Sequence, residues 1–324
     1  MFKKIVINFM PLALRLPIFK LKVLLLNPWL WRFWNQSFAI EGKPILLISL
    51  PRSGSSWLGE VLAQQDDVRY LREPITSTYM SLLNKGFSFF MPNRCRNSHL
   101  YKEAMNKAFS AILNHPGSVL HNPALWRNPK DKKKLFIKEV NPLFLEYFIS
   151  NFNPRIIYLE RCIYASAKSF FALGWKKDDL FTERFDKTTM DKILSIKPDL
   201  LEQDFYFQMG FLQGVILAIN EPLLNNDNVL RTRYEDILVN PKEEISKITK
   251  FLDYKDVQQV YRYLEDSLSS HEAYQIGCFT TKRDSQQLYK KHAQEKLEPD
   301  YIKTIDAHDL AYQRFKVFVD ATLN

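Results

Sequence analysis

The sequence contains few glycines and few cysteines, and each shortage excludes a class of protein. Nine glycines among 324 residues are less than half of the usual level of about 7%, which excludes a collagen-like chain. Three cysteines, Cys95, Cys162 and Cys278, are too widely spaced for a zinc site and are no disulfide framework. These counts favour a reducing compartment, and they give weight to any glycine in a chemically suggestive position.

The first 42 residues are apolar and basic, but no stretch among them is long enough to cross a membrane. Their longest charge-free runs are Ile5–Leu14 and Val23–Trp31, about half of the roughly 20 residues that a spanning helix needs. No signal-peptide cleavage site follows a clean apolar region. Two interpretations stay open: residues 1–40 lie at a membrane surface, or their prolines divide them into short helices packed on the domain. We expect a cytoplasmic protein, free or peripheral on the inner membrane face.

The net charge of +9 favours an anionic partner: a nucleic acid, a membrane surface or a phosphorylated small molecule. The basic residues are scattered among acidic ones and do not cluster on one helix with interleaved aromatic residues. We therefore expect no nucleic-acid partner.

From Lys43 onward, short apolar runs alternate with helical patterns. Such runs are typical of strands buried on both faces of a parallel sheet, and the alternation predicts an α/β fold. The expected strands are Ile45–Leu50, Asp67–Leu71, Leu135–Val140, Arg155–Leu159 and Val229–Tyr234, and the expected helices include Pro142–Phe152, Tyr164–Leu173, Leu201–Leu224 and Pro241–Leu252. We predict one domain over residues 43–324: a doubly wound, mainly parallel sheet flanked by helices, P-loop-NTPase-like, with helical insertions at Thr76–Lys134 and Lys176–Leu200.

The segment LISLPRSGSSWLGEVL predicts a strand, a tight turn and a helix. This geometry points backbone N–H groups and a helix N-terminus at one spot, which favours anion binding. Gly54 lets the backbone approach the ligand, the serines after it can donate hydrogen bonds, and Arg52 adds a fixed charge. Glu60 and Val61 stand where a Walker A motif needs lysine and Ser/Thr, so a plain nucleotide triphosphatase is disfavoured.

With its flanking residues, this loop resembles that of the PAPS-dependent sulfotransferases (PAPS is 3′-phosphoadenylyl sulfate). Their first strand ends in P-[KR]-[ST]-G-[ST]-[ST]-[WFL], which is matched here by Pro51, Arg52, Ser53, Gly54, Ser55, Ser56 and Trp57. The resemblance implies that these residues hold the 5′-phosphate and sulfate end of the donor. It also implies that Arg52 stabilises the leaving group and that no metal is required.

A second block matches the pocket that holds the donor's 3′-phosphate in this family. There an arginine ends a strand and a serine follows eight residues later, as Arg161 and Ser169 do here. An arginine at the carboxyl edge of a sheet offers a two-pronged donor to phosphate. Cys162, Ile163 and Tyr164 depart from the family's usual Asp-Pro-Arg but leave both phosphate ligands in place.

Two further blocks resemble nucleotide contacts of the family. In VLRTRYEDILVNP, Tyr234 matches a tyrosine that contacts the adenine, while Glu235 and Asp236 are expected to be structural; whether Arg233 reaches the site stays open. In FTTKRDSQQLYKKH, Lys282 and Arg283, together with Ser285, resemble a loop that closes over the nucleotide. The alternative for this last block is the start of a basic, solvated helix.

Glu73 is the expected catalytic base. It follows the second strand, at the sheet edge where doubly wound folds bind ligands. In the carbohydrate-directed branch of the family a Glu-Pro carries the proposed base, and Glu73-Pro74 matches it. Alternatively, Glu73 pairs with Arg72 or caps the next helix. Lys138 and Glu139 are possible substrate contacts.

A histidine base, as in the small-molecule branch, has less support, since His99, His115 and His121 all lie in the first insertion.

Together these motifs predict an enzyme that moves a sulfuryl group from PAPS to an acceptor hydroxyl, releasing adenosine 3′,5′-bisphosphate. The acceptor is expected to be a carbohydrate or a lipid-linked glycan. The donor carries about −4 in charge, which gives the basic composition a local explanation. Two alternatives remain: a nucleotide-dependent phosphotransferase, and a non-catalytic nucleotide-binding module on the same scaffold.

Overall fold

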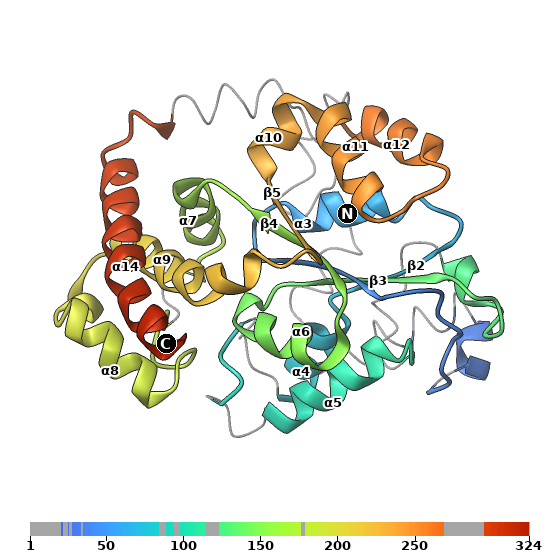
Figure 1. Ribbon diagram of the computed structural model, residues 1–324, viewed down its shortest axis with the longest axis horizontal. Helices are drawn as coiled ribbons and strands as arrows, with labels where there is room; N and C mark the ends of the chain where they lie inside the picture. Colours follow the sequence, from blue (N-terminus) through green and yellow to red (C-terminus); the bar gives the residue numbers. More distant parts are fainter. Residues whose placement is uncertain are drawn as a thin grey trace, which may run out of the picture.

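A parallel five-stranded sheet forms the centre of the protein in a computed structural model (Figure 1). The structure describes residues 21, 25, 28–33, 35–83, 89–93, 98–113, 123–175, 179–268 and 295–323. The strands are β1 (Ile45–Ser49), β2 (Val68–Arg72), β3 (Lys134–Glu139), β4 (Arg155–Glu160) and β5 (Val229–Arg233), in the order β2-β3-β1-β4-β5. Every neighbouring pair is parallel, so the carboxyl ends of all five strands meet at one edge.

Helices cover both faces of the sheet, which explains why most of β1 and the middle residues of its neighbours β3 and β4 are apolar. On one face lie α4 (Pro74–Leu83), α5 (Ser98–Phe109) and α6 (Leu145–Phe152), below the sheet in Figure 1. On the other face lie α3 (Ser55–Leu62), α10 (Tyr234–Val239), α11 (Pro241–Phe251) and α12 (Gln258–Leu268). Alternate residues of β1 enter the two cores, Leu46 and Ile48 the first and Ile45 and Leu47 the second, as the period of two in a strand requires.

A third group of helices packs beside the sheet, at the left of Figure 1. It comprises α7 (Ile163–Ala172), α8 (Lys187–Ile196), α9 (Phe205–Leu224) and α14 (Pro299–Leu323). The last of these, α14, was not among the helices expected from the sequence. Two glycines of α9 let α14 approach closely, because a Cβ added at Gly210 would lie 2.1 Å from the carbonyl oxygen of Thr304, and one at Gly214 2.3 Å from that of His308.

Short 3₁₀ helices complete the connections: η1 (Pro28–Phe33), η3 (Pro123–Trp126), η4 (Pro142–Phe144) and η6 (Leu200–Glu202).

A short stretch before β1 also belongs to the core. Phe38 is 2% exposed and packs edge-on against Trp126. The guanidinium of Arg69 lies 4.9 Å from the Phe38 ring centre and donates hydrogen bonds to the carbonyls of Ala39, Leu125 and Asn128. Part of the region before residue 43 is therefore tied to the sheet.

The predicted fold class is confirmed. All five expected strands are present, with ends that differ by a residue or so, and a loop after the central strand leads into a helix as in P-loop folds. Both insertions contain helices, with α5 in the first and α8 in the second. Within the described ranges, no helix has both the length and the apolar character to span a membrane.

Candidate functional site

The turn between β1 and α3 is shaped by left-handed backbone at two positions. Arg52 has φ 69° and Gly54 has φ 87°, a region that residues other than glycine adopt at a cost. A Cβ on Gly54 would lie 2.5 Å from the ring of Tyr234, so only glycine fits between this turn and α10. Beneath the turn, the hydroxyl of Ser49 donates to that of Ser55 at 2.8 Å.

Arg52, expected at the 5′-phosphate end of the donor, contacts Arg161 and Ser169, the two residues expected at its 3′-phosphate. Its Nε donates a hydrogen bond to the hydroxyl of Ser169 at 2.9 Å, and its backbone carbonyl accepts one from Nη1 of Arg161 at 2.6 Å. Arg161 also lies over the ring of Tyr234, 5.3 Å from the centroid. Its Nε is buried and has no hydrogen-bond partner among the described residues. The two predicted phosphate pockets are thus adjacent at the carboxyl edge of the sheet.

Several predicted nucleotide contacts are buried beside this turn. Trp57 is 0% exposed, and its indole N–H donates to the hydroxyl of Ser267 on α12 at 2.9 Å. Tyr234 is 2% exposed and meets Trp57 edge-on, with 5.9 Å between ring centroids. Ser53 and Ser55 are also buried. In this structure the two rings support the turn, and their contact with a nucleotide stays a prediction.

Glu235, next to Tyr234, holds the start of α7. Its Oε1 accepts the backbone N–H of Cys162 at 3.0 Å, directly before the helix that carries Ser169. A carboxylate at a helix N-terminus is stabilised by the unpaired N–H groups there. Arg233 is exposed.

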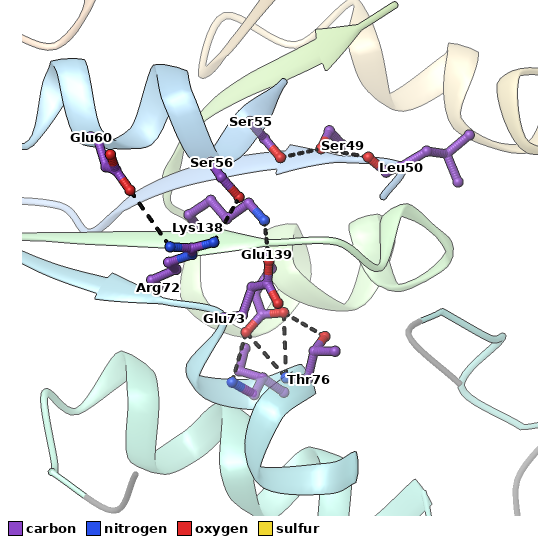
Figure 2. Close-up of polar contacts among 11 residues, drawn as sticks. Ser49, Leu50, Ser55, Ser56, Glu60, Arg72, Glu73, Thr76, Lys138 and Glu139 are labelled. Atoms are coloured by element: carbon purple, nitrogen blue, oxygen red, sulfur yellow. Dashed lines mark hydrogen bonds and ion pairs between the residues drawn. The ribbon is translucent and has the colours of Figure 1, made fainter. Parts of the chain in front are cut away.

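The carboxylate of Glu73 pairs with the ammonium of Lys138 at the ends of β2 and β3 (Figure 2). The register of these strands places Arg72 opposite Lys138, so the backbone N–H of Glu73 reaches the carbonyl of Lys138 at 2.7 Å. The side chain of Lys138 is 2% exposed, whereas that of Glu73 is 29% exposed. Burial alone would raise the pKa of Glu73, but the charges of Lys138 and Arg72 outweigh it and lower the pKa.

Arg72 does not form the ion pair that one alternative assigned to it. Its guanidinium instead lies 3.5 Å from the carboxylate of Glu60 and donates to the hydroxyl of Ser56 at 3.4 Å. Arg72 therefore connects the end of β2 to the first turn of α3, next to the phosphate loop. Sequence reasoning missed this link because it depends on β2 and α3 lying side by side.

Glu139, and not the Glu73 side chain, caps α4. Glu139 is 0% exposed, and its carboxylate accepts hydrogen bonds from the backbone N–H groups of Ile75 and Thr76 and from the hydroxyl of Thr76. Burial raises the pKa of Glu139 to about 7 against the opposing effect of these hydrogen bonds. Glu139 thus contacts protein groups on α4.

Most of the remaining predicted residues lie outside the described part of the chain. Lys282, Arg283 and Ser285 lie outside the described residues, as do His115 and His121. His99 is described and is exposed on α5. Among the described residues, no three His, Cys, Asp or Glu side chains gather as a metal site would require.

Comparison with known proteins also indicates a sulfotransferase. Residues 43–297 match the family model described as a sulfotransferase domain. No curated protein matches the chain. Among solved structures, the sulfotransferase domain of the Synechococcus PCC 7002 olefin synthase is similar at 14% identity and a TM-score of 0.45, over 85% of this chain and 97% of that one.

Two further sulfotransferase structures show similar levels of likeness. STF9 from Mycobacterium avium has 12% identity and a TM-score of 0.41, with 90% of this chain and 87% of that one covered. Mouse SULT7A1, complexed with PAP, has 16% identity and a TM-score of 0.35, with 86% and 79% covered. Because these likenesses are distant, the assignment rests on the family model, which covers most of the chain: this protein belongs to the sulfotransferase domain family.

Proposed function

We propose that the protein transfers a sulfuryl group from PAPS to a hydroxyl group of a carbohydrate or glycolipid. The observation that carries this proposal is the meeting of Arg52, Arg161 and Ser169 beside the Gly54 turn. Two arginines and a hydroxyl at the carboxyl edge of a parallel sheet suit a ligand with two separate phosphate groups.

The donor would be held at both of its phosphates. Arg52 and the turn before α3 are proposed to hold the 5′-phosphate and sulfate end, where backbone N–H groups and a helix N-terminus favour an anion. Arg161 and Ser169 are proposed to hold the 3′-phosphate. The Nε of Arg161 is buried and has no hydrogen-bond partner in the described part of the chain. This supports the assignment, because a buried donor without a partner is costly unless a ligand satisfies it.

The proposed reaction is an in-line displacement at sulfur. The acceptor oxygen forms a bond to the sulfur, the bond from sulfur to the 5′-phosphate oxygen breaks, and adenosine 3′,5′-bisphosphate leaves. Glu73 takes the proton of the acceptor hydroxyl. Its lowered pKa keeps it ionised at neutral pH, which is the form that a general base requires. Arg52 is proposed to neutralise charge on the leaving phosphate.

The carbohydrate acceptor is proposed from the Glu73-Pro74 pair, which resembles the carbohydrate-directed branch. Glu73 is partly exposed at the sheet edge, so an acceptor can reach it. A glycan array with radiolabelled PAPS tests this class. Sulfation of phenols or steroids alone would overturn the acceptor assignment.

We also propose that the sulfotransferase domain spans residues 43–324, with Phe38 packed on it, and that the basic, apolar residues before Phe38 hold it at the inner membrane face. The composition of this segment supports such contact. Cell fractionation tests the proposal, and recovery of all the protein in the cytosolic fraction would overturn it.

Calorimetric titration with adenosine 3′,5′-bisphosphate, compared with ATP and magnesium, tests the donor assignment. We expect micromolar binding of the bisphosphate and none of ATP. Binding of ATP alone would overturn the sulfotransferase proposal and favour the phosphotransferase. Bisphosphate binding without sulfuryl transfer to any glycan, phenol or steroid would favour a binding module.

A further inference from the structure

The buried carboxylate of Glu139 contacts the residues that follow Glu73 in the chain. Glu139 ends β3 and is 0% exposed. Its Oε1 accepts the backbone N–H of Ile75 at 2.6 Å and that of Thr76 at 3.2 Å, and its Oε2 accepts the hydroxyl of Thr76 at 2.6 Å (Figure 2). All three donors belong to the first turn of α4, whose N–H groups have no partner within the helix.

Glu73 immediately precedes this turn and has strained backbone. Its φ of 49° is in the left-handed region, which costs a residue with a side chain about 1 kcal/mol or more. Such a conformation persists only where neighbouring contacts hold it. The N–H of Glu73 donates to the carbonyl of Lys138 at 2.7 Å, and the carbonyl of Glu73 accepts the N–H of Ser77 at 2.9 Å.

Two consecutive residues of β3, Lys138 and Glu139, therefore contact the two ends of this turn. Lys138 holds Glu73 through its backbone carbonyl and its ammonium, while Glu139 holds Ile75 and Thr76 through its carboxylate. Because side chains alternate along a strand, one strand end can reach both ends of the turn.

We infer that Glu139 is a positioning residue for Glu73: by anchoring the first turn of α4 through Thr76, it keeps the Glu73 carboxylate against Lys138. The inference rests on the proposed function, in which Glu73 is the base. Glu139 does not touch the substrates. It acts through the backbone of the turn.

The test is the titration of the Glu73 carboxyl, followed by carbon-13 NMR of the full chain labelled at glutamate. The groups that face Glu73 are Lys138, Arg72, Glu139 and Tyr70. The variants Glu73→Gln and Glu139→Gln assign the two carboxyl signals. Thr76→Val removes the hydroxyl while nearly keeping the shape of the side chain. Thr78→Val is the matched control, because the Thr78 hydroxyl donates to the carbonyl of Pro74 on the same helix and not to Glu139.

In the wild type we expect Glu73 to titrate below its ordinary value. In Thr76→Val and Glu139→Gln, a loosened Glu73–Lys138 pair raises this pKa by about one unit or more, since an opposite charge at contact distance shifts a pKa by that amount. Thr76→Ser keeps the hydroxyl and should therefore show the wild-type titration of Glu73. Thr78→Val leaves it unchanged.

An unchanged Glu73 titration in both Thr76→Val and Glu139→Gln would overturn the inference, and so would an equal shift in Thr78→Val. The experiment needs neither donor nor acceptor. Failure of adenosine 3′,5′-bisphosphate to bind the wild type would overturn the proposed function, whereas the titration judges the anchoring of Glu73 separately.

Discussion

Arg52 and Ser169 are 117 residues apart in the chain, and the Nε of the first donates to the hydroxyl of the second at 2.9 Å. Arg52 follows β1 and Ser169 is on α7, which follows the neighbouring strand β4. The residues proposed for the two ends of one nucleotide are therefore in direct contact. Substitution of either residue tests which phosphate of the donor it binds.

Ser169→Ala should weaken adenosine 3′,5′-bisphosphate about tenfold or more, because a hydrogen bond to a charged group contributes about 1.5–3 kcal/mol. A nucleotide lacking the 3′-phosphate, adenosine 5′-monophosphate, should lose much less. Calorimetric titration of both nucleotides measures the difference. Ser166→Ala, at another buried serine of α7, is the matched control, and equal losses for both nucleotides in Ser169→Ala would refute the pocket.

Glu73→Gln should lower turnover of PAPS by about 10²–10⁴, the usual contribution of a general base. Affinity for adenosine 3′,5′-bisphosphate should stay nearly constant, since Glu73 is assigned to the acceptor. Release of the bisphosphate during glycan sulfation gives the rate, and calorimetry gives the affinity. Wild-type turnover in this variant would remove Glu73 as the base.

Lys138→Met should move the acid limb of turnover to higher pH. The pKa of Glu73 is lowered in the folded protein, so its carboxylate stays ionised below its ordinary value of 4.5 and is lost only at lower pH. Without the ammonium, only the charge of Arg72 still opposes burial, and the limb rises by about 1–3 pH units.

The pH dependence of turnover measures this shift. Lys134→Met, at the opposite end of β3 where Lys134 lies 3.6 Å from Asp67, should leave the limb in place. A limb that does not move in Lys138→Met contradicts the electrostatic role of this pair.

Glu139 should make the fold less stable as pH rises. Its pKa is raised from 4.5 to about 7 in the folded protein, so its stabilising effect is complete below about pH 4.5 and disappears as pH passes through about 7. Linkage bounds the change at about 3 kcal/mol.

Urea unfolding of the wild type and Glu139→Gln between pH 4.5 and 8 measures it, because the titrating groups other than Glu139 and the neighbouring Glu73 are common to both. The free-energy difference between the two proteins should change across this range in favour of the variant. A constant difference would mean that Glu139 keeps an ordinary pKa.

Gly210→Ala should lower the free energy of unfolding by about 1–3 kcal/mol, the range for an overpacked core. The added Cβ would meet the carbonyl oxygen of Thr304 at 2.1 Å, and rigid backbone cannot move aside as a side chain can. Alanine is otherwise the better helix former by about 1 kcal/mol. Thermal and urea unfolding measure the change, and a stability equal to or above that of the wild type would show that α9 and α14 separate at no cost.

Local patterns in the sequence determined the strands, the glycine turn and the nature of the candidate ligand-binding groups. Apolar runs such as Ile45–Ser49 predict buried strands because a strand covered on both faces needs no polar side chains. The Gly54 turn was recognisable because few other glycines occur in the chain. These properties depend on residues that are neighbours along the chain.

Only the tertiary structure decided which of these residues meet. Strand order places β4 beside β1, which brings Arg161 and Ser169 to Arg52. The register of β2 and β3 pairs Glu73 with Lys138 instead of Arg72. The period of an apolar pattern indicates the element and its buried face, but not the neighbouring strand or its register. Partner choice is therefore settled by packing of the whole chain.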